Sequence, residues 1–342
     1  MQRKPTMSDV ARLAGVGTMT VSRVLNASAN VSDEAALRVQ TAIDQLNYRP
    51  NELARALRGQ RTRSIGLILP YLYDPFFAMC GHAVTTVARQ RGYSVVMTTS
   101  NEDPDTEYAE ASQMLQRHVD GLLAIPANQG QSRLNRALLG KTPLVAFDRP
   151  LADPAFDTVL VHNQSGSKRM VQHLLEHGHK AITFMGLSRS LYTINARFLG
   201  YRKAMTEAGL EPDAWFQCET MESTLEAIRS RLKQKKPPTA YFTSNTLATR
   251  YVFAALLQLG VHIPASAALA GFDDFDLAEL TSPPLTVVRQ PAQEMGRVAA
   301  GQLFERLERG ETQQTGNRIV LPVEMVLRRS CGCKNKTAVV MH

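Results

Sequence analysis

Cysteine is scarce in this chain: it occurs four times in 342 residues, at scattered positions. A disulfide framework needs several closely spaced pairs, so we expect free thiols in a reducing compartment. Two of the cysteines, Cys331 and Cys333, form a CxC near the end of the sequence, but no second pair of ligands accompanies them. We therefore expect neither a disulfide fold nor a metal site.

Long hydrophobic runs are also missing. No stretch approaches the ~18 apolar residues of a membrane span, and the first residues lack the apolar segment of a secretory signal. The longest apolar stretches, such as Ile65–Tyr73, have the length of a strand. These absences predict a cytoplasmic protein.

Catalytic motifs are a third absence. The sequence contains no GxSxG, P-loop, HExxH or paired Cys–His spacing. Asp148 and Asp273 are conceivable as an acid–base pair, but nothing in the sequence indicates perturbed pKa values. We expect a protein that is not an enzyme and that uses no cofactor.

The charge of the chain is unevenly distributed. Its net charge is +8, and residues 1–63 carry +5 of this, with ten Lys or Arg against five Asp or Glu. A basic N-terminal segment suits contact with DNA phosphates, although a solvated basic face would show the same excess. The hydrophobic content of 44% is enough for a packed core.

Residues 6–26, TMSDVARLAGVGTMTVSRVLN, predict two short helices joined by a tight turn. The first, over 8–14, follows a capping box of Thr6 and Asp9 and ends at Gly15. Its buried face is expected to hold Val10, Leu13 and Ala14. The second helix starts near Thr18 and buries Val21, Val24 and Leu25. Its other face presents Thr18, Met19, Ser22 and Arg23.

This pattern is typical of a helix-turn-helix, whose second helix reads base edges in the major groove. Helical hairpins that never touch DNA share the spacing. A third helix, capped by Ser32 and ending near Leu46, would close a small core. Its contributions to that core are expected to be Leu37, Ile43 and Leu46.

Residues 51–59 contain good helix formers but are too few for a helix that is stable alone. They are either an ordinary linker or a hinge helix that folds when docked. Leu53 and Leu57 share one face, and a leucine in the minor groove can wedge between base pairs and bend DNA.

From Ile65 onward, apolar runs of strand length alternate with helical segments. We predict strands at 64–69, 94–98, 121–125, 144–147, 182–185, 240–243 and 268–272. Helices are expected at 75–90, 105–117, 166–177, 195–208 and 247–259. The alternation indicates parallel α/β sheets in two lobes, about 64–160 and 165–325. Ligands of such sheets bind beyond the carboxyl ends of the strands, here in the cleft between the lobes.

Several ordered blocks resemble the LacI/GalR family of bacterial transcription regulators over essentially the whole chain. Besides residues 6–26 they include LNYRPNELARAL, RTRSIGLILPYLYDPFFA, EHGHKAITFMGL and LAGFDDFDLAEL. The resemblance implies a three-helix head, a hinge helix and a two-lobed core like that of periplasmic binding proteins. It also implies a homodimer on a near-palindromic operator, since two-fold proteins match two-fold sites.

The resemblance further implies site residues. Thr18 and Met19 take the base-reading positions, Arg23 is the recognition-helix arginine and Leu57 is the intercalating leucine. The implied phosphate or base contacts are Thr6, Ser22, Asn26 and Asn51. The implied effector contacts are Asp74, Phe76, Phe77, Asp148, Arg197, Asp273 and Gln290. Such a set suits a polyol, because aromatic rings stack on a sugar while carboxylates and arginine bind its hydroxyl groups.

Each of these effector residues could instead be an ordinary loop or capping residue. Phe77 could instead be a core residue. Three positions depart from the family pattern. Gly17 replaces a serine often found before the second helix. Thr246 stands where aspartate is usual, and His162 precedes Asn163 where aspartate is common. These departures leave room for a different ligand.

We therefore expect a cytoplasmic, nucleoid-associated repressor that a sugar or sugar derivative releases from a palindromic operator. The alternatives are a solute-binding protein with the same core and a regulator that needs a purine-type corepressor. The expected divisions are a DNA-binding domain at 1–50, a hinge and linker at 51–63, a core at 64–330 and a tail at 331–342.

Overall fold

The computed structural model describes residues 5–25, 31–48, 61–128, 130–310, 316–333 and 337–341. The chain forms two compact units, which divide between residues 62 and 63. In these described segments no helix is both long enough and apolar enough to span a membrane.

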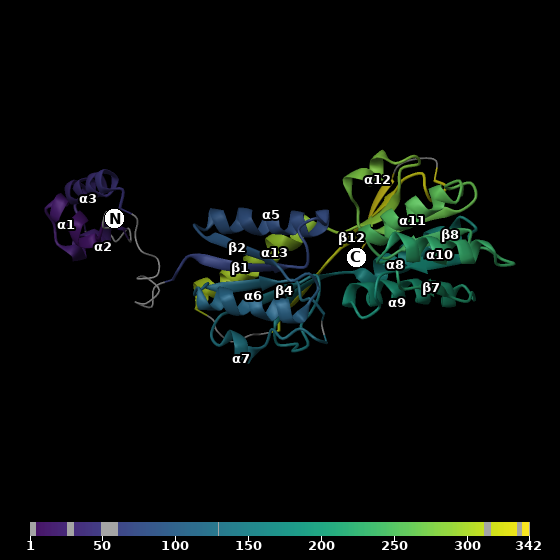
Figure 1. The fold of residues 1–342 in the computed structure, drawn as a ribbon, viewed down its shortest axis with the longest axis horizontal. Coiled ribbons are helices and arrows are strands. Elements are labelled where there is room, and N and C mark those ends of the chain that lie inside the picture. The colour runs from purple at the N-terminus through teal and green to yellow at the C-terminus, as the bar shows by residue number, and fades with distance from the viewer. Residues whose placement is uncertain are drawn as a thin grey trace. The chain divides into compact units, whose positions relative to one another are not determined.

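The first unit contains the three predicted helices, α1 (Met7–Ala14), α2 (Thr18–Leu25) and α3 (Asp33–Leu46) (Figure 1). Gly15 ends α1 in the left-handed conformation, with φ of 64°. Ser32 caps α3 through its side chain. The core of this unit contains Val10, Ala11, Ala14, Val21, Val39, Ala42 and Tyr48.

The prediction that Leu13 and Leu37 belong to the core of this unit is wrong, because Leu13 is 49% exposed and Leu37 is 69% exposed. The buried face of α3 runs through residues 39, 42, 43 and 46, which is the helical i, i+3, i+4, i+7 pattern. Leu37 precedes Val39 by two residues and so lies on the opposite side of the helix. In α1 the small side chain of Ala11 takes the place expected for Leu13.

The second unit has two lobes, each built on a sheet. The first sheet has the order β11-β5-β4-β3-β1-β2 and is parallel throughout. Its strands are β1 (Ser64–Leu69), β2 (Ser94–Thr99), β3 (Gly121–Ala124), β4 (Leu144–Phe147), β5 (Asp157–Val161) and β11 (Arg318–Leu321). Its helices are α5 (Pro75–Gln90), α6 (Pro104–Gln116), α7 (Arg136–Leu139) and α13 (Ala292–Arg309).

The second sheet has the order β13-β12-β10-β9-β8-β6-β7. Its strands are β6 (Ile182–Met185), β7 (Asp213–Trp215), β8 (Ala240–Thr243), β9 (Ala268–Phe272), β10 (Thr286–Arg289), β12 (Val323–Leu327) and β13 (Thr337–Met341). Its helices are α8 (Asn163–Glu176), α9 (Tyr192–Glu207), α10 (Met221–Leu232), α11 (Thr246–Gln258) and α12 (Asp276–Leu280).

The structure corrects two sequence-based expectations about this sheet. β12 pairs antiparallel with β10, and β13 pairs antiparallel with β12, so the sheet is mixed rather than wholly parallel. The segment 331–342, expected as a separate tail, supplies β13 and the buried Cys331. The sequence did not predict this strand, because a short apolar run with no helix beside it does not show the alternation of strands and helices. Periodicity also cannot identify the strand with which such a run pairs.

The lobes also do not follow the predicted division at 160–165. The chain passes between the lobes where β5 is followed by α8, β10 by α13 and β11 by β12. Helix α13 and strand β11 therefore belong to the first lobe, in which Figure 1 shows α13. Helix α13 packs on α5 and on strands β3, β4 and β5. The alternation of strands and helices gives the order of elements but does not say to which sheet a returning segment is added.

Each lobe has one helix pair that approaches closely at a glycine. A Cβ at Gly296 of α13 would lie 2.4 Å from the carbonyl oxygen of Cys80 on α5, and one at Gly200 of α9 would lie 2.1 Å from that of Gln164 on α8. Any side chain at these two positions would push the helices apart.

Candidate functional site

The predicted base-reading residues lie on the exposed side of α2. Thr18, Met19 and Arg23 are exposed, with Met19 at 69%, and Ser22 is half-buried. Val21 on the opposite side is fully buried and anchors the helix to the head. The head therefore presents a short helix with a polar, basic outer side, as a recognition helix requires.

Thr6 forms the predicted capping box. Its hydroxyl and its backbone N–H both donate to Asp9 Oδ2, at 2.6 and 2.9 Å, and the Asp9 N–H donates back at 3.4 Å. These polar groups thus orient the start of α1, and a DNA contact of Thr6 stays a prediction. Three predicted DNA contacts lie outside the described residues: Asn26, Asn51 and Leu57. Most of the predicted hinge also lies outside them.

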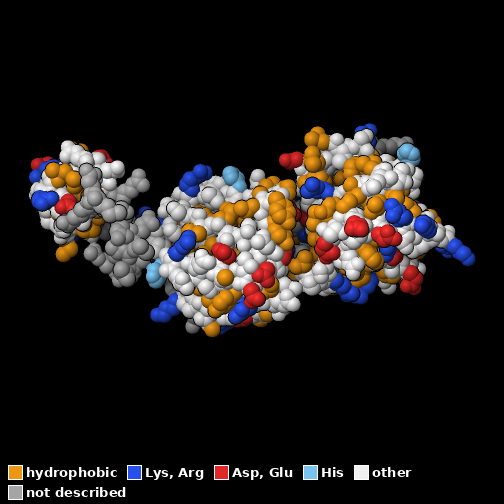
Figure 2. Space-filling model, in the orientation of Figure 1, with side chains coloured by type: hydrophobic (Ala, Val, Ile, Leu, Met, Phe, Trp, Pro, Cys, Tyr) orange, Lys and Arg blue, Asp and Glu red, His pale blue; other side chains and the backbone are white. Residues whose placement is uncertain are grey.

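Between the lobes of the core lies a small cavity of about 70 Å³. Figure 2 shows the boundary between the lobes as an indentation of the surface. All seven predicted effector residues line this cavity, although each of them is more than 50 residues from some of the others in sequence. They are Asp74, Phe76, Phe77, Asp148, Arg197, Asp273 and Gln290.

Helix α9 contributes the buried side chain of Arg197 to the cavity wall. Its Nε donates to Asn163 Oδ1 at 2.8 Å, and its Nη1 donates to the carbonyl of Ser244 at 2.7 Å and to Asp273 Oδ2 at 3.2 Å. Its guanidinium lies 3.8 Å from the ring centroid of Phe272. These contacts fix the guanidinium plane and leave Nη2 as the group that it can offer to a ligand.

Asp148 and Asp273 occupy corresponding places in the two lobes. Each directly follows a buried strand, β4 or β9, and each has a positive φ, of 63° and 74°. Their backbone N–H groups donate to the neighbouring strands, at Val159 and Val288, over 2.8 Å. Non-glycine residues with positive φ are costly and concentrate at ligand sites. The pair therefore marks the carboxyl ends of both sheets as the functional edge.

Two carboxyl groups of the cavity titrate unusually. Burial raises the pKa of Asp148 to about 6, although Arg149 and Arg197 oppose the shift. Burial and the charge of Asp273 raise the pKa of Asp74 to about 6. Nothing in the sequence indicated these raised pKa values, because a sequence cannot show how deeply a carboxyl group is buried. Raised carboxyl pKa values arise at ligand sites as well as at catalytic ones.

Buried polar atoms without a protein partner point into the same region. Among the described residues, Asp148 Oδ1 and Gln290 Oε1 have none, although Gln290 Nε2 donates to Asp273 Oδ1 at 2.5 Å. Asn163 Nδ2 beside Arg197 is a third such atom. Unpaired buried polar atoms are costly, so a site that keeps them is one in which another molecule supplies the partner.

The sequence analysis missed further lining residues that obey the strand-end rule. They include Tyr71 after β1, Glu102 after β2, Arg149 after β4, Leu187 after β6 and Asn245 after β8. Arg149 is paired with Glu102, its Nη2 lying 2.7 Å from Glu102 Oε1. Examining the residues just after every predicted strand would have found them. Of the departures from the family pattern, Thr246 is buried at the start of α11, and neither it nor His162 lines the cavity.

The chain matches known proteins over almost its full length. Residues 6–51 match the model for bacterial regulatory proteins of the lacI family, and residues 171–331 match a periplasmic binding protein-like domain. It is 33% identical over 334 residues to the HTH-type transcriptional repressor PurR of Actinobacillus pleuropneumoniae, which covers 97% of this chain and 99% of that protein. It is 34% identical over 313 residues to the ribose operon repressor of Escherichia coli, covering 90% and 95%.

Solved structures agree on the fold. The Lac repressor dimer bound to operator and the anti-inducer ONPF has a TM-score of 0.85 at 24% identity, covering 96% of this chain and 99% of that one. The head and the two-lobed core together define a DNA-binding regulator with a ligand-binding body. The chain belongs to the lacI family of bacterial regulatory proteins and is a transcriptional repressor of that family.

Proposed function

We propose that the cavity between the lobes binds a sugar or a sugar derivative, and that this effector controls operator binding. The observation that carries the proposal is the unpaired Asp148 Oδ1 and Gln290 Oε1 next to Arg197 in one cavity. Two acceptors and a guanidinium fit the paired hydroxyl groups of a polyol, and the buried ring of Phe76 offers an apolar face for its C–H groups.

Names of similar proteins support this class of ligand. Besides the ribose operon repressor, one solved relative at 29% identity is a transcriptional regulator in complex with cellobiose, and it covers 95% of this chain with a TM-score of 0.69. The repressors named PurR are about equally similar to this chain. A purine-type corepressor is therefore the competing outcome of the binding test.

The cavity volume of about 70 Å³ bears on mechanism. Sites for small molecules usually measure about 300–1,000 Å³, so we expect the lobes to move apart or shift when a sugar enters this cavity. A ligand that prefers one lobe arrangement shifts the population toward it. Because coupling is reciprocal, an effector that weakens operator binding must itself bind less tightly to the operator complex.

The first test is a thermal-shift screen of the full chain against pentoses, hexoses, cellobiose, hypoxanthine and guanine. We expect a sugar to raise the melting temperature of the core and to release the protein from operator DNA. If a purine instead stabilised the protein and tightened its binding to the operator, the effector would be a corepressor rather than an inducer. The proposed ligand class would be contradicted if none of these compounds released the protein from DNA and none changed its melting temperature.

We also propose that Arg23 reads a base, since arginine can donate two hydrogen bonds to guanine. Arg23→Ala is expected to weaken the free energy of binding to the operator by ~1–3 kcal/mol and to relax the preference for one base pair. The measurement is fluorescence anisotropy on the operator and its single-base variants. Arg38→Ala, which removes an exposed arginine of α3, is the matched control. Equal weakening by both variants on every DNA would show that Arg23 contacts only phosphate.

We place the protein in the cytoplasm, where operator DNA is found, and assign it no catalytic role. The reported relatives are transcriptional repressors rather than enzymes. In this proposal the raised pKa values of Asp74 and Asp148 serve ligand binding, because each carboxyl group can donate or accept a hydrogen bond near neutral pH.

A further inference from the structure

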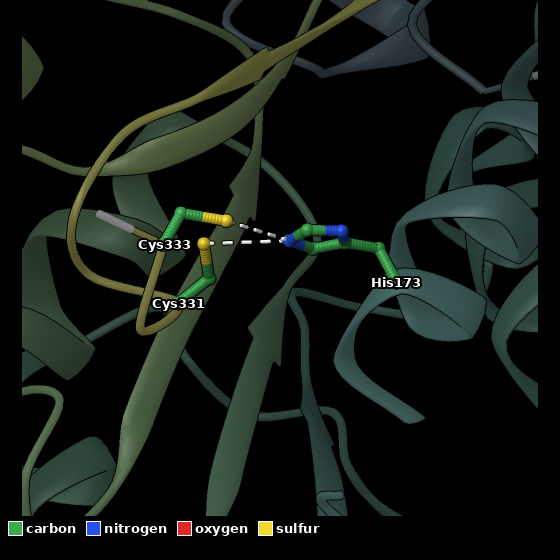
Figure 3. A group of neighbouring side chains, drawn as sticks. All are labelled: His173, Cys331 and Cys333. Carbon is green, nitrogen blue, oxygen red and sulfur yellow. Dashed lines mark hydrogen bonds between the residues drawn. The ribbon is translucent and has the colours of Figure 1, made fainter. Parts of the chain in front are cut away.

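A cluster of two histidines and two cysteines lies in the second lobe, apart from the cavity. His173 and His177 stand one turn apart on α8, and Cys331 and Cys333 follow β12. His173 Nε2 lies 3.4 Å from Cys331 Sγ and 3.5 Å from Cys333 Sγ, and His177 Nε2 lies 3.4 Å from Cys333 Sγ. Figure 3 shows the His173 ring directed at both sulfur atoms.

Hydrogen bonds alone do not account for this arrangement. A ring nitrogen offers either one N–H or one lone pair, so His173 Nε2 cannot bond well to two thiols at once. In a tetrahedral zinc site with Zn–S of ~2.3 Å and Zn–N of ~2.0 Å, a bound nitrogen and sulfur lie about 3.5 Å apart. The measured nitrogen–sulfur distances agree with this value.

The surroundings also suit a cation. The His177 ring nitrogen Nδ1 lies 2.9 Å from the carbonyl oxygen of His173, which turns Nε2 toward Cys333. A ligating histidine usually donates its other N–H to such a carbonyl. The Thr286 hydroxyl donates to Cys331 Sγ at 3.0 Å. A hydroxyl donor of this kind supports a thiolate.

The backbone aims the two thiols together. Gly332 between them has φ of 92°, a conformation that side chains rarely adopt, and its N–H donates to the carbonyl of Arg329 at 3.1 Å. Cys331 is fully buried, whereas Cys333 is half-buried and His177 is exposed. The cluster is thus preformed on its inner side and open to solvent on its outer side.

We propose that His173, Cys331 and Cys333, whose ligand atoms all lie within 4.8 Å of one another, bind one borderline-soft divalent cation, with Zn²⁺ as the best fit, and that His177 beside Cys333 completes the ligand set. Two sulfur and two nitrogen ligands in a tetrahedral set favour zinc over magnesium or calcium, which prefer oxygen. The cation would join the C-terminal end of α8 to the segment after β12. Binding displaces the thiol protons, because cysteine binds zinc as the thiolate.

The test uses the full chain, reduced and stripped of metal, and titrated with Co²⁺ as a spectroscopic probe. We expect one equivalent to give tetrahedral d–d bands and thiolate-to-cobalt charge transfer, and Zn²⁺ to displace it. Cys333→Ser and His177→Ala should weaken binding at least ~10-fold. They are preferred to variants of the buried Cys331 because they are less apt to disturb folding.

His179→Ala is the matched control, since this half-buried histidine is two residues from His177 but outside the cluster. It should bind Co²⁺ as the unchanged chain does. Zn²⁺ should also raise the melting temperature of the unchanged chain and of His179→Ala but not of the two ligand variants. Absence of a thiolate-to-cobalt band in the reduced chain, or an equal band in Cys333→Ser, would overturn the proposal.

Discussion

Replacing Arg197 with alanine is expected to destabilise the core by about 3–5 kcal/mol and to abolish effector binding. Arg197 is 2% exposed and joins Asn163, the carbonyl of Ser244 and Asp273. Its removal leaves the carboxylate of Asp273 buried with only Gln290 as a side-chain donor. The unfolding free energy is measured by urea denaturation, with the fluorescence of Trp215, the single tryptophan, reporting on the second lobe.

Two further variants separate charge from packing. Arg197→Met keeps apolar volume over the Phe272 ring, so it should restore part of the stability but none of the ligand affinity. The double variant Arg197→Met, Asp273→Asn should lose less stability than the sum of the two single variants, by ~1–3 kcal/mol. The reason is that the double variant no longer contains the unpaired carboxylate of Asp273. Arg202→Ala, an exposed position on the same helix, is the control. Additive losses would show that the two side chains are not energetically coupled.

Much of the core follows from local sequence patterns. The strands β1, β4, β6, β8 and β9 and the helix α5 have the predicted bounds, because each is a short apolar run or an amphipathic segment between clear breaks. The seven effector residues, placed by family resemblance, do share one cavity. Their roles as ligand contacts stay predictions, but the strand-end rule explains why Asp148 and Asp273 meet there.

Other features depend on contacts between distant parts of the chain, which periodicity does not encode. The return of α13 and β11 to the first lobe is one case. The pairing of Cys331 and Cys333 with histidines more than 150 residues earlier is another. The spacing CxC carries little information by itself, and His173 and His177 look like ordinary helix residues until α8 is packed beside the end of β12.

Asp148→Asn is the second variant with a large expected effect, and the effect depends on pH. The folded chain raises the pKa of Asp148 to about 6, above the unfolded value of about 3.9. Between these values the folded state binds the proton more strongly, so the contribution of Asp148 to stability is greatest at low pH and is lost as the pH rises through 6. At pH 7.5 the buried carboxylate therefore costs on the order of 3 kcal/mol, which asparagine avoids.

The variant should consequently gain stability relative to the unchanged chain as the pH rises from 4.5 to 7.5, while its affinity for the effector falls. The comparison is made by urea denaturation at several pH values, which cancels the titration of the other groups. Asp105→Asn, whose side chain is 81% exposed, serves as the control. A stability difference independent of pH would mean that Asp148 is not held in an unfavourable charged state. A gain at neutral pH with weaker ligand binding would instead show that the site retains a destabilising carboxylate because the effector needs it.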